Sequence, residues 1–254
     1  EHEAYPKDAK DYFFTWPRDA MYILEAANIL NLNIHEGFFN WCTKAEGWKE
    51  TGLFFEKYHV TGKKALFHFQ PDQTGSVIIA LCSYLKKHPG KRNKHHELLS
   101  KSANALSDLW KKDHLDAVTQ DLWEERLCFP DLKENFTYSI AICAKALLEA
   151  HEITPNEKWL KTGQKMKSVL TGLEHDHFPR SSGLMDDLRP DASLLGLVWP
   201  AGIVEAGHPK MGQTVKLMEE KIVSGSGVYR YENDEYDGWM YQDKHHRKKG
   251  AGYW

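Results

Sequence analysis

The sequence predicts an all-α protein. Apolar residues recur at helical spacing in the longer segments, and no segment shows the sustained alternation of a strand. Nor do the segments follow the spacing of strand–helix–strand units. Between the predicted helices lie long loops that are rich in aromatic and acidic residues. If consecutive helix pairs form a ring, we expect these loops to gather at one end of it.

In the N-terminal half, a long excursion interrupts the predicted helices. Residues 52–69 lack helical periodicity, and they predict a turn at Thr61-Gly62 with a short hairpin. Pro89-Gly90 ends the helix that follows this excursion. Apolar spacing predicts helices over residues 19–32, 33–49 and 73–87.

In the C-terminal half, one helix start carries a strong signal. Thr154 has the character of an N-cap, and Glu157 completes a capping box with it. Residues 194–204 are apolar enough to be fully buried, and Gly225 ends the last predicted helix. The spacing predicts helices over residues 97–112, 136–151, 154–173 and 209–223.

Composition limits the class of protein. At 254 residues, of which 41% are hydrophobic and 27% charged, the chain can bury a sizeable core. The formal net charge of -3 gives no electrostatic case for nucleic acid or for an acidic membrane surface. No apolar run approaches the roughly 20 residues of a membrane span, and the N-terminus lacks the pattern of a signal peptide. We expect a soluble protein without a nucleic-acid or membrane partner.

Cysteine usage bears on the compartment. None of the cysteines has Cys-x-x-Cys spacing, and three of them lie in apolar or helical surroundings, so buried free thiols are the expected state. Free thiols and the lack of a signal peptide favour the cytoplasm. The cysteines are Cys42, Cys82, Cys128 and Cys143.

One loop between predicted helices carries the sequence DLWEER, residues 121–126. A tryptophan, two adjacent acids and an arginine are unusual in a core, and they suit a pocket that holds a polar ring and donates a proton. The alternative is a charged, solvated loop with one tryptophan packed beneath it. Loops of similar composition favour the pocket, and they lie at residues 12–19, 67–72, 189–193 and 229–234.

These loops together resemble a known family. The motifs YFFTWPRD (12–19), DLWEE (121–125), DASLLG (191–196) and YRY (229–231) followed by Asp234 occur in the order found in glucoamylase-type enzymes, glycoside hydrolase family 15. The resemblance spans nearly the whole chain. It implies an (α/α)6 toroid, in which two concentric layers of helices place the active site at the mouth of the inner ring.

The resemblance also implies an activity. It is that of an exo-acting, inverting hydrolase of α-glucosidic bonds, which releases glucose from the non-reducing ends of α-glucans or oligosaccharides. Glucodextranase-like and trehalase-like specificities are variants of the same chemistry, and the sequence leaves the linkage preference open. The implied partner is the sugar substrate, and no metal or cofactor is implied.

Roles carry over from the family residue by residue. Glu124 corresponds to the general acid and Glu125 to a substrate-binding acid. Arg18 and Asp19 correspond to a pair that binds hydroxyls of the terminal sugar, although such a pair is also common as a salt bridge at a helix start. Further substrate contacts are implied at Tyr12, Trp16, Trp123, Arg230 and Asp234, and, in a stretch that keeps the family pattern only in part, at Gln70 and Asp72.

The chemistry of hydrolysis fits these residue types. A glycosidic oxygen is a poor leaving group, so a carboxylic acid must deliver a proton as the bond breaks. Glu124 stands between Trp123 and Glu125, and we expect the indole and the neighbouring carboxylate to help it keep that proton. Arg18 offers a planar fork of donors beside the Asp19 acceptor, which suits vicinal hydroxyls.

Chain length leads to a further expectation. A toroid of twelve helices, at ~11 to 12 residues each plus loops, needs more helices than the sequence predicts. We therefore expect residues 1–254 to be a single catalytic-type domain that lacks the first helix and the last helices. Inversion also needs a second carboxylate as general base, and the resemblance places it beyond Trp254.

Two other hypotheses remain open at this stage. The first is a catalytically incompetent remnant that binds carbohydrate or serves a structural role, because the base is not evident and an open ring would expose apolar helix faces. The second is a metal protein, although histidines in polar loops are usually solvated. Its candidate ligands are His95-His96, His175, His177 and His245-His246.

Overall fold

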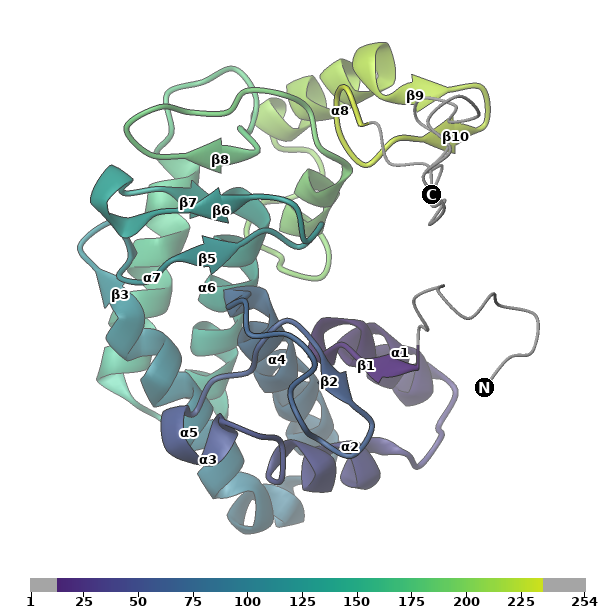
Figure 1. Ribbon diagram of the computed structural model, residues 1–254, viewed down its shortest axis with the longest axis vertical. Helices are drawn as coiled ribbons and strands as arrows, with labels where there is room; N and C mark the ends of the chain where they lie inside the picture. The colour runs from purple at the N-terminus through teal and green to yellow at the C-terminus, as the bar shows by residue number, and fades with distance from the viewer. Residues whose placement is uncertain (1–12, 235–254) are drawn as a thin grey trace.

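Most of the helices form two rows, as Figure 1 shows for the computed structural model, which describes residues 13–234. The inner row runs from α1 through α4 and α6 to the 3-10 helix η3, each packed against the next. The outer row consists of α2, α5 and α7. The helices are α1 (Pro17–Ile29), α2 (His35–Cys42), α3 (Trp48–Thr51), α4 (Pro71–Lys87), α5 (Arg92–Leu109), α6 (Thr137–Ile153), α7 (Glu157–Thr171) and α8 (Pro209–Lys221), with 3-10 helices η1 (Pro89–Lys91), η2 (Pro130–Leu132) and η3 (Ala192–Leu197).

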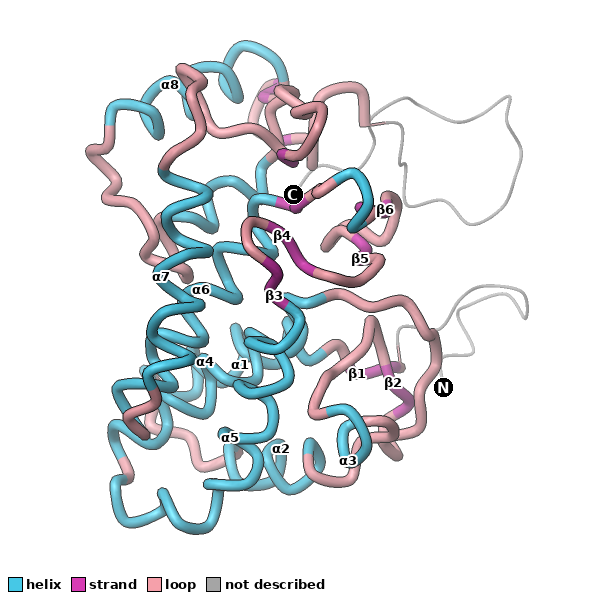
Figure 2. The backbone as a smooth tube through the Cα atoms, turned by 90° about the vertical axis from the view of Figure 1, so that its left-hand side faces the viewer, coloured by secondary structure: helices cyan, strands magenta, loops and turns pink. Residues whose placement is uncertain are grey.

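The strands are short, and each forms one two-residue antiparallel pair with a partner. The pairs are β1 (Phe14–Thr15) with β2 (Tyr58–His59), β3 (Trp110–Lys111) with β4 (His114–Leu115), β5 (Thr119–Gln120) with β6 (Leu127–Cys128), β7 (Asn135–Phe136) with β8 (Ser181–Ser182), and β9 (Val223–Ser224) with β10 (Gly227–Val228). Figure 2 shows β1 to β6 and their loops on one side of α4 to α7. The predicted all-α class and the gathering of the loops at one end are confirmed.

The inner helices are the centre of the core. Residues 71–82 of α4 are all buried, and so are residues 137–144 of α6. A helix that buries its whole circumference must have neighbours on every side, and α4 packs against α1, α5 and α6. At the α4–α6 crossing, a Cβ on Gly75 would lie 2.8 Å from Ile142 Cγ2, so only glycine permits this approach.

The predicted helix over residues 33–49 is wrong in its extent. The chain there forms two helices, α2 and the single turn α3, with a turn between them. Gly47 directly precedes α3 at a φ of 84°, a left-handed conformation that no α-helix can contain. Apolar spacing alone does not reveal such a break, because Trp48 on α3 is buried like Phe39 and Cys42 on α2.

The predicted capping box at Thr154 is also wrong. Thr154 ends α6, since its backbone N–H bonds to the carbonyl of Ala150. The N-cap of α7 is Asn156, whose side chain accepts the backbone N–H groups of Lys158 and Trp159. Asparagine is as good an N-cap as threonine, and it lies two residues nearer to the helix.

Two further boundaries differ from the predictions. The helix expected over 97–112 begins at Arg92 and ends at Leu109, where the chain turns into β3. The segment 194–204 is not fully buried, because Leu195 is 49% and Trp199 61% exposed. Its first part is the 3-10 helix η3, which places residues three apart on one face and turns the others outward.

Other predictions are confirmed. The turn at Thr61-Gly62 exists: the Gly62 N–H bonds to the His59 carbonyl at 2.8 Å. All the cysteines have buried, free thiols, and burial raises their pKa values. No helix within residues 13–234 is long and apolar enough to cross a membrane.

Glu36, near the start of α2, ties the outer row to the inner one. Its carboxylate accepts a hydrogen bond from the Tyr84 hydroxyl on α4 at 2.8 Å, and it contacts Lys94 and His95 on α5. Burial would raise the pKa of Glu36, but hydrogen bonds from Lys94, Tyr84 and His95 outweigh burial. The pKa of Glu36 is therefore lowered to about 2.

We expect acid to weaken this junction. Because the folded state lowers the pKa of Glu36 from 4.5 to about 2, its stabilisation is complete above pH 4.5 and is lost as the pH falls towards 2. In urea unfolding, Glu36→Gln should lower the free energy of unfolding at neutral pH by on the order of 2 kcal/mol, and the deficit should shrink in acid. The exposed Glu50→Gln on α3 is the control. A deficit that does not change with pH would contradict this assignment.

Candidate active site

The acidic loop is the turn of the β5–β6 hairpin. The Asp121 backbone N–H bonds to the Arg126 carbonyl at 3.0 Å and closes the turn. The Asp121 carboxylate then accepts the backbone N–H groups of Glu125 (2.9 Å) and Arg126 (3.1 Å). Glu124 has a φ of 64°, a conformation that a non-glycine residue adopts only where its surroundings hold it. Hydrogen bonds among its own residues therefore fix the conformation of the turn.

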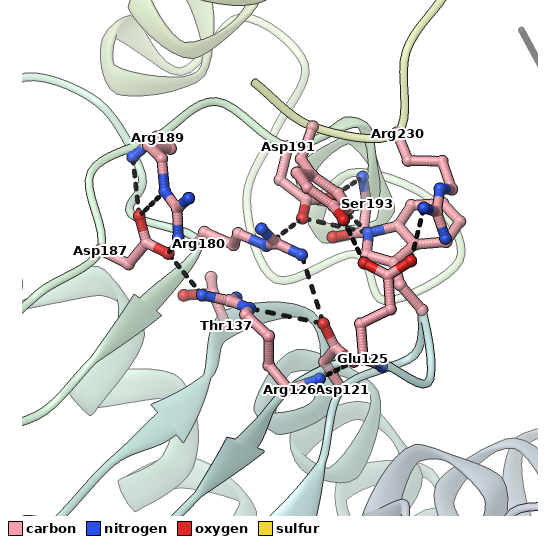
Figure 3. A network of polar contacts seen from close by, with 12 residues as sticks. Asp121, Glu125, Arg126, Thr137, Arg180, Asp187, Arg189, Asp191, Ser193 and Arg230 are labelled. Atoms are coloured by element: carbon pink, nitrogen blue, oxygen red, sulfur yellow. Dashed lines mark hydrogen bonds and ion pairs between the residues drawn. The ribbon is translucent and has the colours of Figure 1, made fainter. Parts of the chain in front are cut away.

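A buried network of ion pairs fixes the position of the β5–β6 turn (Figure 3). Arg180, the residue directly before β8, lies 3.3 Å from Asp121 Oδ2 and 2.6 Å from Asp191 Oδ2. The indole Nε1 of Trp123 donates to both carboxylate oxygens of Asp191, each at 3.1 Å. Burial raises the pKa of Asp191, and Arg180 is the main group that opposes this rise. Because Arg180 joins the two carboxylates, it locks the hairpin turn to the start of η3.

Glu124 faces the start of the inner row. The indole Nε1 of Trp16, the residue before α1, donates to Glu124 Oε1 at 2.7 Å. Asp19 lies in the first turn of α1, and its side chain is 62% exposed. Burial of part of its carboxyl raises the pKa of Asp19, Arg18 opposes the rise, and the charge of Glu124 adds to it. Trp16, Asp19 and Glu124 therefore converge on one open face.

Arg18 is held in place by buried partners. Its guanidinium donates to Gln70 at 3.0 Å and to Asp72 at 3.1 Å, and it lies 3.6 Å from Asp19. Ser139 on α6 donates to the second oxygen of Asp72 at 3.0 Å. Burial would lower the pKa of Arg18, but Asp72 and Asp19 raise it above its ordinary value. The arginine is a permanent cation with a fixed direction.

Glu125 points to a different set of partners from those of Glu124. Arg230 donates to Glu125 Oε1 at 2.6 Å and holds Asp234 through two bonds of 2.7 and 2.8 Å. The Tyr231 hydroxyl donates to the other oxygen of Glu125. Burial and the contact with Glu125 raise the pKa of Tyr231 to about 12. Arg230 also lies 5.6 Å above the Trp123 ring, which joins this set to the hairpin turn.

The structure brings most of the predicted site residues together, in two groups. The first group consists of Glu124, Trp16, Arg18 and Asp19, and the second lies around Glu125. Three positions differ from this arrangement. Gln70 and Asp72 are fully buried beneath Arg18, and Tyr12 lies outside the described residues. The second group consists of Trp123, Glu125, Arg230 and Asp234.

The expected neighbour of Glu124 needs correction. Adjacency in the sequence predicts that the charge of Glu125 acts on Glu124, but the Glu125 carboxylate instead accepts hydrogen bonds from Arg230 and Tyr231. The Glu124 carboxyl instead meets that of Glu56, within hydrogen-bonding reach. Adjacent residues in a tight turn point apart, so adjacency in the sequence did not give proximity of the charges.

The structure places three residues at the site to which the sequence assigned no role. Arg180 is supplied by a loop, and no local pattern marks it, whereas Tyr231 belongs to the YRY motif but was given no role of its own. Glu56 did carry a signal, because it is an acid within an aromatic run, FFEKY. Such an acid is either solvated or held by a specific partner, and the structure buries it.

The histidines do not assemble a metal site in the part of the chain that the structure describes. Within residues 13–234 no group of three or more histidine, cysteine or acidic side chains could hold a metal ion. His95 and His175 each contact a carboxylate, Glu36 and Asp186 respectively. His245-His246 lie outside the described residues.

Comparison with known proteins gives a consistent result. The family model described as glycosyl hydrolases family 15 matches residues 3–246. An uncharacterized glycosyl hydrolase of Methanocaldococcus jannaschii is 27% identical over 248 residues, which are 92% of this chain and 39% of that protein. This chain therefore spans about two fifths of the length of that relative.

Solved structures share the fold. A glycosidase in complex with glucose superposes with a TM-score of 0.68 at 15% identity, over 86% of this chain and 64% of that one. A bacterial glucoamylase in complex with acarbose superposes with a TM-score of 0.68 at 20% identity, over 88% of this chain and 36% of that one. These likenesses confirm the predicted fold class, the (α/α)6 toroid.

Proposed function

The chain belongs to glycosyl hydrolase family 15, and on this premise we propose that it acts as an exo-acting, inverting hydrolase of α-glucosidic bonds. Its substrates are α-glucans or oligosaccharides, from whose non-reducing ends it releases glucose. The observation that carries the proposal is the Glu124 carboxyl, held by Trp16 at 2.7 Å beside the Arg18–Asp19 pair. A proton donor then stands next to groups that bind sugar hydroxyls.

In this proposal Glu124 is the general acid. It protonates the glycosidic oxygen as the bond to the anomeric carbon breaks, so that the leaving sugar departs as a neutral alcohol. The hydrogen bond from the Trp16 indole occupies Oε1 and leaves Oε2 to carry the proton. The strained backbone of Glu124 and the hydrogen bonds from the turn's N–H groups to the Asp121 carboxylate hold the Glu124 carboxyl in one orientation. A proton donor requires such a fixed orientation.

The terminal sugar would lie between the two groups of side chains. The exposed Asp19 carboxylate accepts hydrogen bonds from hydroxyls, while Arg18 donates, and vicinal hydroxyls fit this pairing. The Trp16 and Trp123 rings offer flat apolar surfaces on which a sugar ring can stack. Glu125 and Arg230 provide an acceptor and a donor on the other side. We include Tyr12 among these contacts on the resemblance alone.

Gln70 and Asp72 take a supporting role in the proposal. Both are fully buried, so neither reaches a bound sugar. Their contacts with Arg18 fix the direction of its guanidinium, and Ser139 fixes Asp72 in turn. They act through Arg18 and position it.

The anomeric form of the product tests the proposal. Inversion turns an α-linkage into β-glucose, because water attacks the face opposite to the leaving group. We expect proton NMR spectra, recorded as maltotriose is consumed, to show β-glucose before mutarotation forms the α-anomer. Early α-glucose would contradict inversion. Maltotriose that binds in calorimetry without any turnover would favour the carbohydrate-binding alternative.

A further inference from the structure

Glu56 is a buried acid at the site for which the proposed function gives no role. It lies between α3 and β2, and its side chain is 1% exposed. Its backbone N–H bonds to the His68 carbonyl at 3.0 Å, which fixes the segment in place. Burying a carboxylate is costly unless it is paired or takes up a proton. The surroundings of Glu56 decide between these two outcomes.

The two oxygens of Glu56 differ in their contacts. Oε2 lies 3.0 Å from His68 Nδ1. Oε1 is buried without a hydrogen-bond partner in the described part of the chain, and the nearest cation, the Lys57 ammonium, is 3.8 Å away. That ammonium also lies 5.3 Å above the Trp16 ring, whose indole N–H is bonded to Glu124. Glu56 is therefore part of one cluster with Lys57, Trp16 and Glu124.

The contact between the Glu56 and Glu124 carboxyls requires a proton. An ionised carboxylate only accepts hydrogen bonds, so two ionised carboxylates in contact would repel each other. One proton between them turns the repulsion into a hydrogen bond and gives the buried Oε1 of Glu56 a partner. The sharing of a proton explains an arrangement that otherwise leaves a buried acceptor unsatisfied.

The charges around Glu56 support this protonation. Burial and then the charge of Glu124 raise the pKa of Glu56, while His68 and Lys57 lower it. The raising effects win, so the pKa of Glu56 lies above its ordinary value. Asp19 also faces Glu124 and adds negative charge to the same cluster.

We propose that Glu56 shares one proton with Glu124 and is the positioning residue that keeps the general acid supplied with a proton. This inference rests on the proposed function for the role of Glu124. Two carboxyls in contact lose their protons in two separate steps, because the second ionisation must overcome the first charge. The pair thus retains one proton to a higher pH than a lone carboxyl would, and in the proposed function Glu124 would deliver that proton to the glycosidic oxygen.

Titration of the carboxyls tests the shared proton without any need for turnover. In protein labelled with 13C at the glutamate side-chain carboxyl, the Glu56 resonance should titrate above the ordinary glutamate range. In Glu124→Gln, its midpoint should fall by roughly one pH unit or more, because the opposing charge is gone. The exposed Glu50→Gln should leave the Glu56 midpoint unchanged. A Glu56 midpoint that is identical in wild type and Glu124→Gln overturns the proposal.

Unfolding gives a second measurement that is independent of activity. Because the folded state raises the pKa of Glu56, it binds this proton more tightly than the unfolded chain does. The stability contributed by the protonated carboxyl is present at low pH and is lost as the pH rises through the folded-state pKa. The free energy of unfolding of wild type relative to Glu56→Gln should therefore decrease from acidic to neutral pH. A constant difference would contradict the proposal.

The pH profile connects the shared proton to catalysis. In Glu56→Gln, the basic limb of the kcat/KM profile should move to lower pH by roughly one unit, with little change of KM. A merely structural role would lower activity at every pH and leave the limb in place, which would contradict the proposal. If the protein lacks hydrolytic activity, the proposed function fails, and the carboxyl titration still decides whether the proton is shared.

Discussion

Glu124→Gln is expected to lower kcat for maltotriose by about 10^3-fold, with little change in sugar binding. Glutamine keeps the size of the side chain, and its carbonyl oxygen can still accept the Trp16 indole N–H. It cannot give up a proton to the leaving oxygen, so the glycosidic bond must break without acid catalysis. Initial rates of glucose release measure the loss, and calorimetric titration with maltotriose measures the retained binding.

A substrate whose leaving group needs no proton distinguishes the loss of the general acid from a general loss of structure. Fluoride leaves α-glucosyl fluoride without a proton, so Glu124→Gln should retain far more of its activity on this substrate than on maltotriose. Asp131→Asn, on the exposed helix η2 after the hairpin, is the matched control and should behave as wild type. Equal losses on both substrates would show that Glu124 does not act as the acid.

The parts of the fold that the sequence predicted are those with local causes. The inner helices α4 and α6 bury residues along their whole lengths, and their apolar composition shows this without any knowledge of partners. The interruption before α3 and the start of α7 were not predicted correctly. The left-handed Gly47 and the Asn156 cap depend on single backbone conformations, which spacing does not encode.

The site residues likewise divide into those that a local motif predicted and those that it did not. Ordered motifs marked Glu124, Arg18 and Arg230, since each motif is a short contiguous run. Glu56 and Arg180 were not marked, because they reach the site only when distant segments meet. Arg180 lies 59 positions from its partner Asp121. Single residues that become neighbours through the packing of whole layers leave no periodic or spaced signal in one sequence.

Arg180→Met is expected to destabilise the protein by about 3 to 5 kcal/mol, which corresponds to a fall in melting temperature on the order of 10 °C. Methionine fills much of the same volume but leaves two carboxylates, Asp121 and Asp191, without their shared cation. Breaking a buried ion pair on one side is costly because the remaining charge stays desolvated. The hairpin turn also loses its link to η3, so hydrolysis should fall together with stability.

The pH dependence of this loss identifies its cause. Burial raises the pKa of Asp191, and Arg180 is the main group that opposes the rise, so without Arg180 the carboxyl takes up a proton more readily. The stability deficit of Arg180→Met, measured by urea unfolding, should therefore shrink as the pH falls. Arg189→Met removes an arginine that is paired with Asp187 and nearly half exposed on the same loop, and it should cost less than about 1 kcal/mol. Were the two variants equally unstable, or the Arg180→Met deficit constant with pH, the Arg180 network would not be what holds the acidic turn in place.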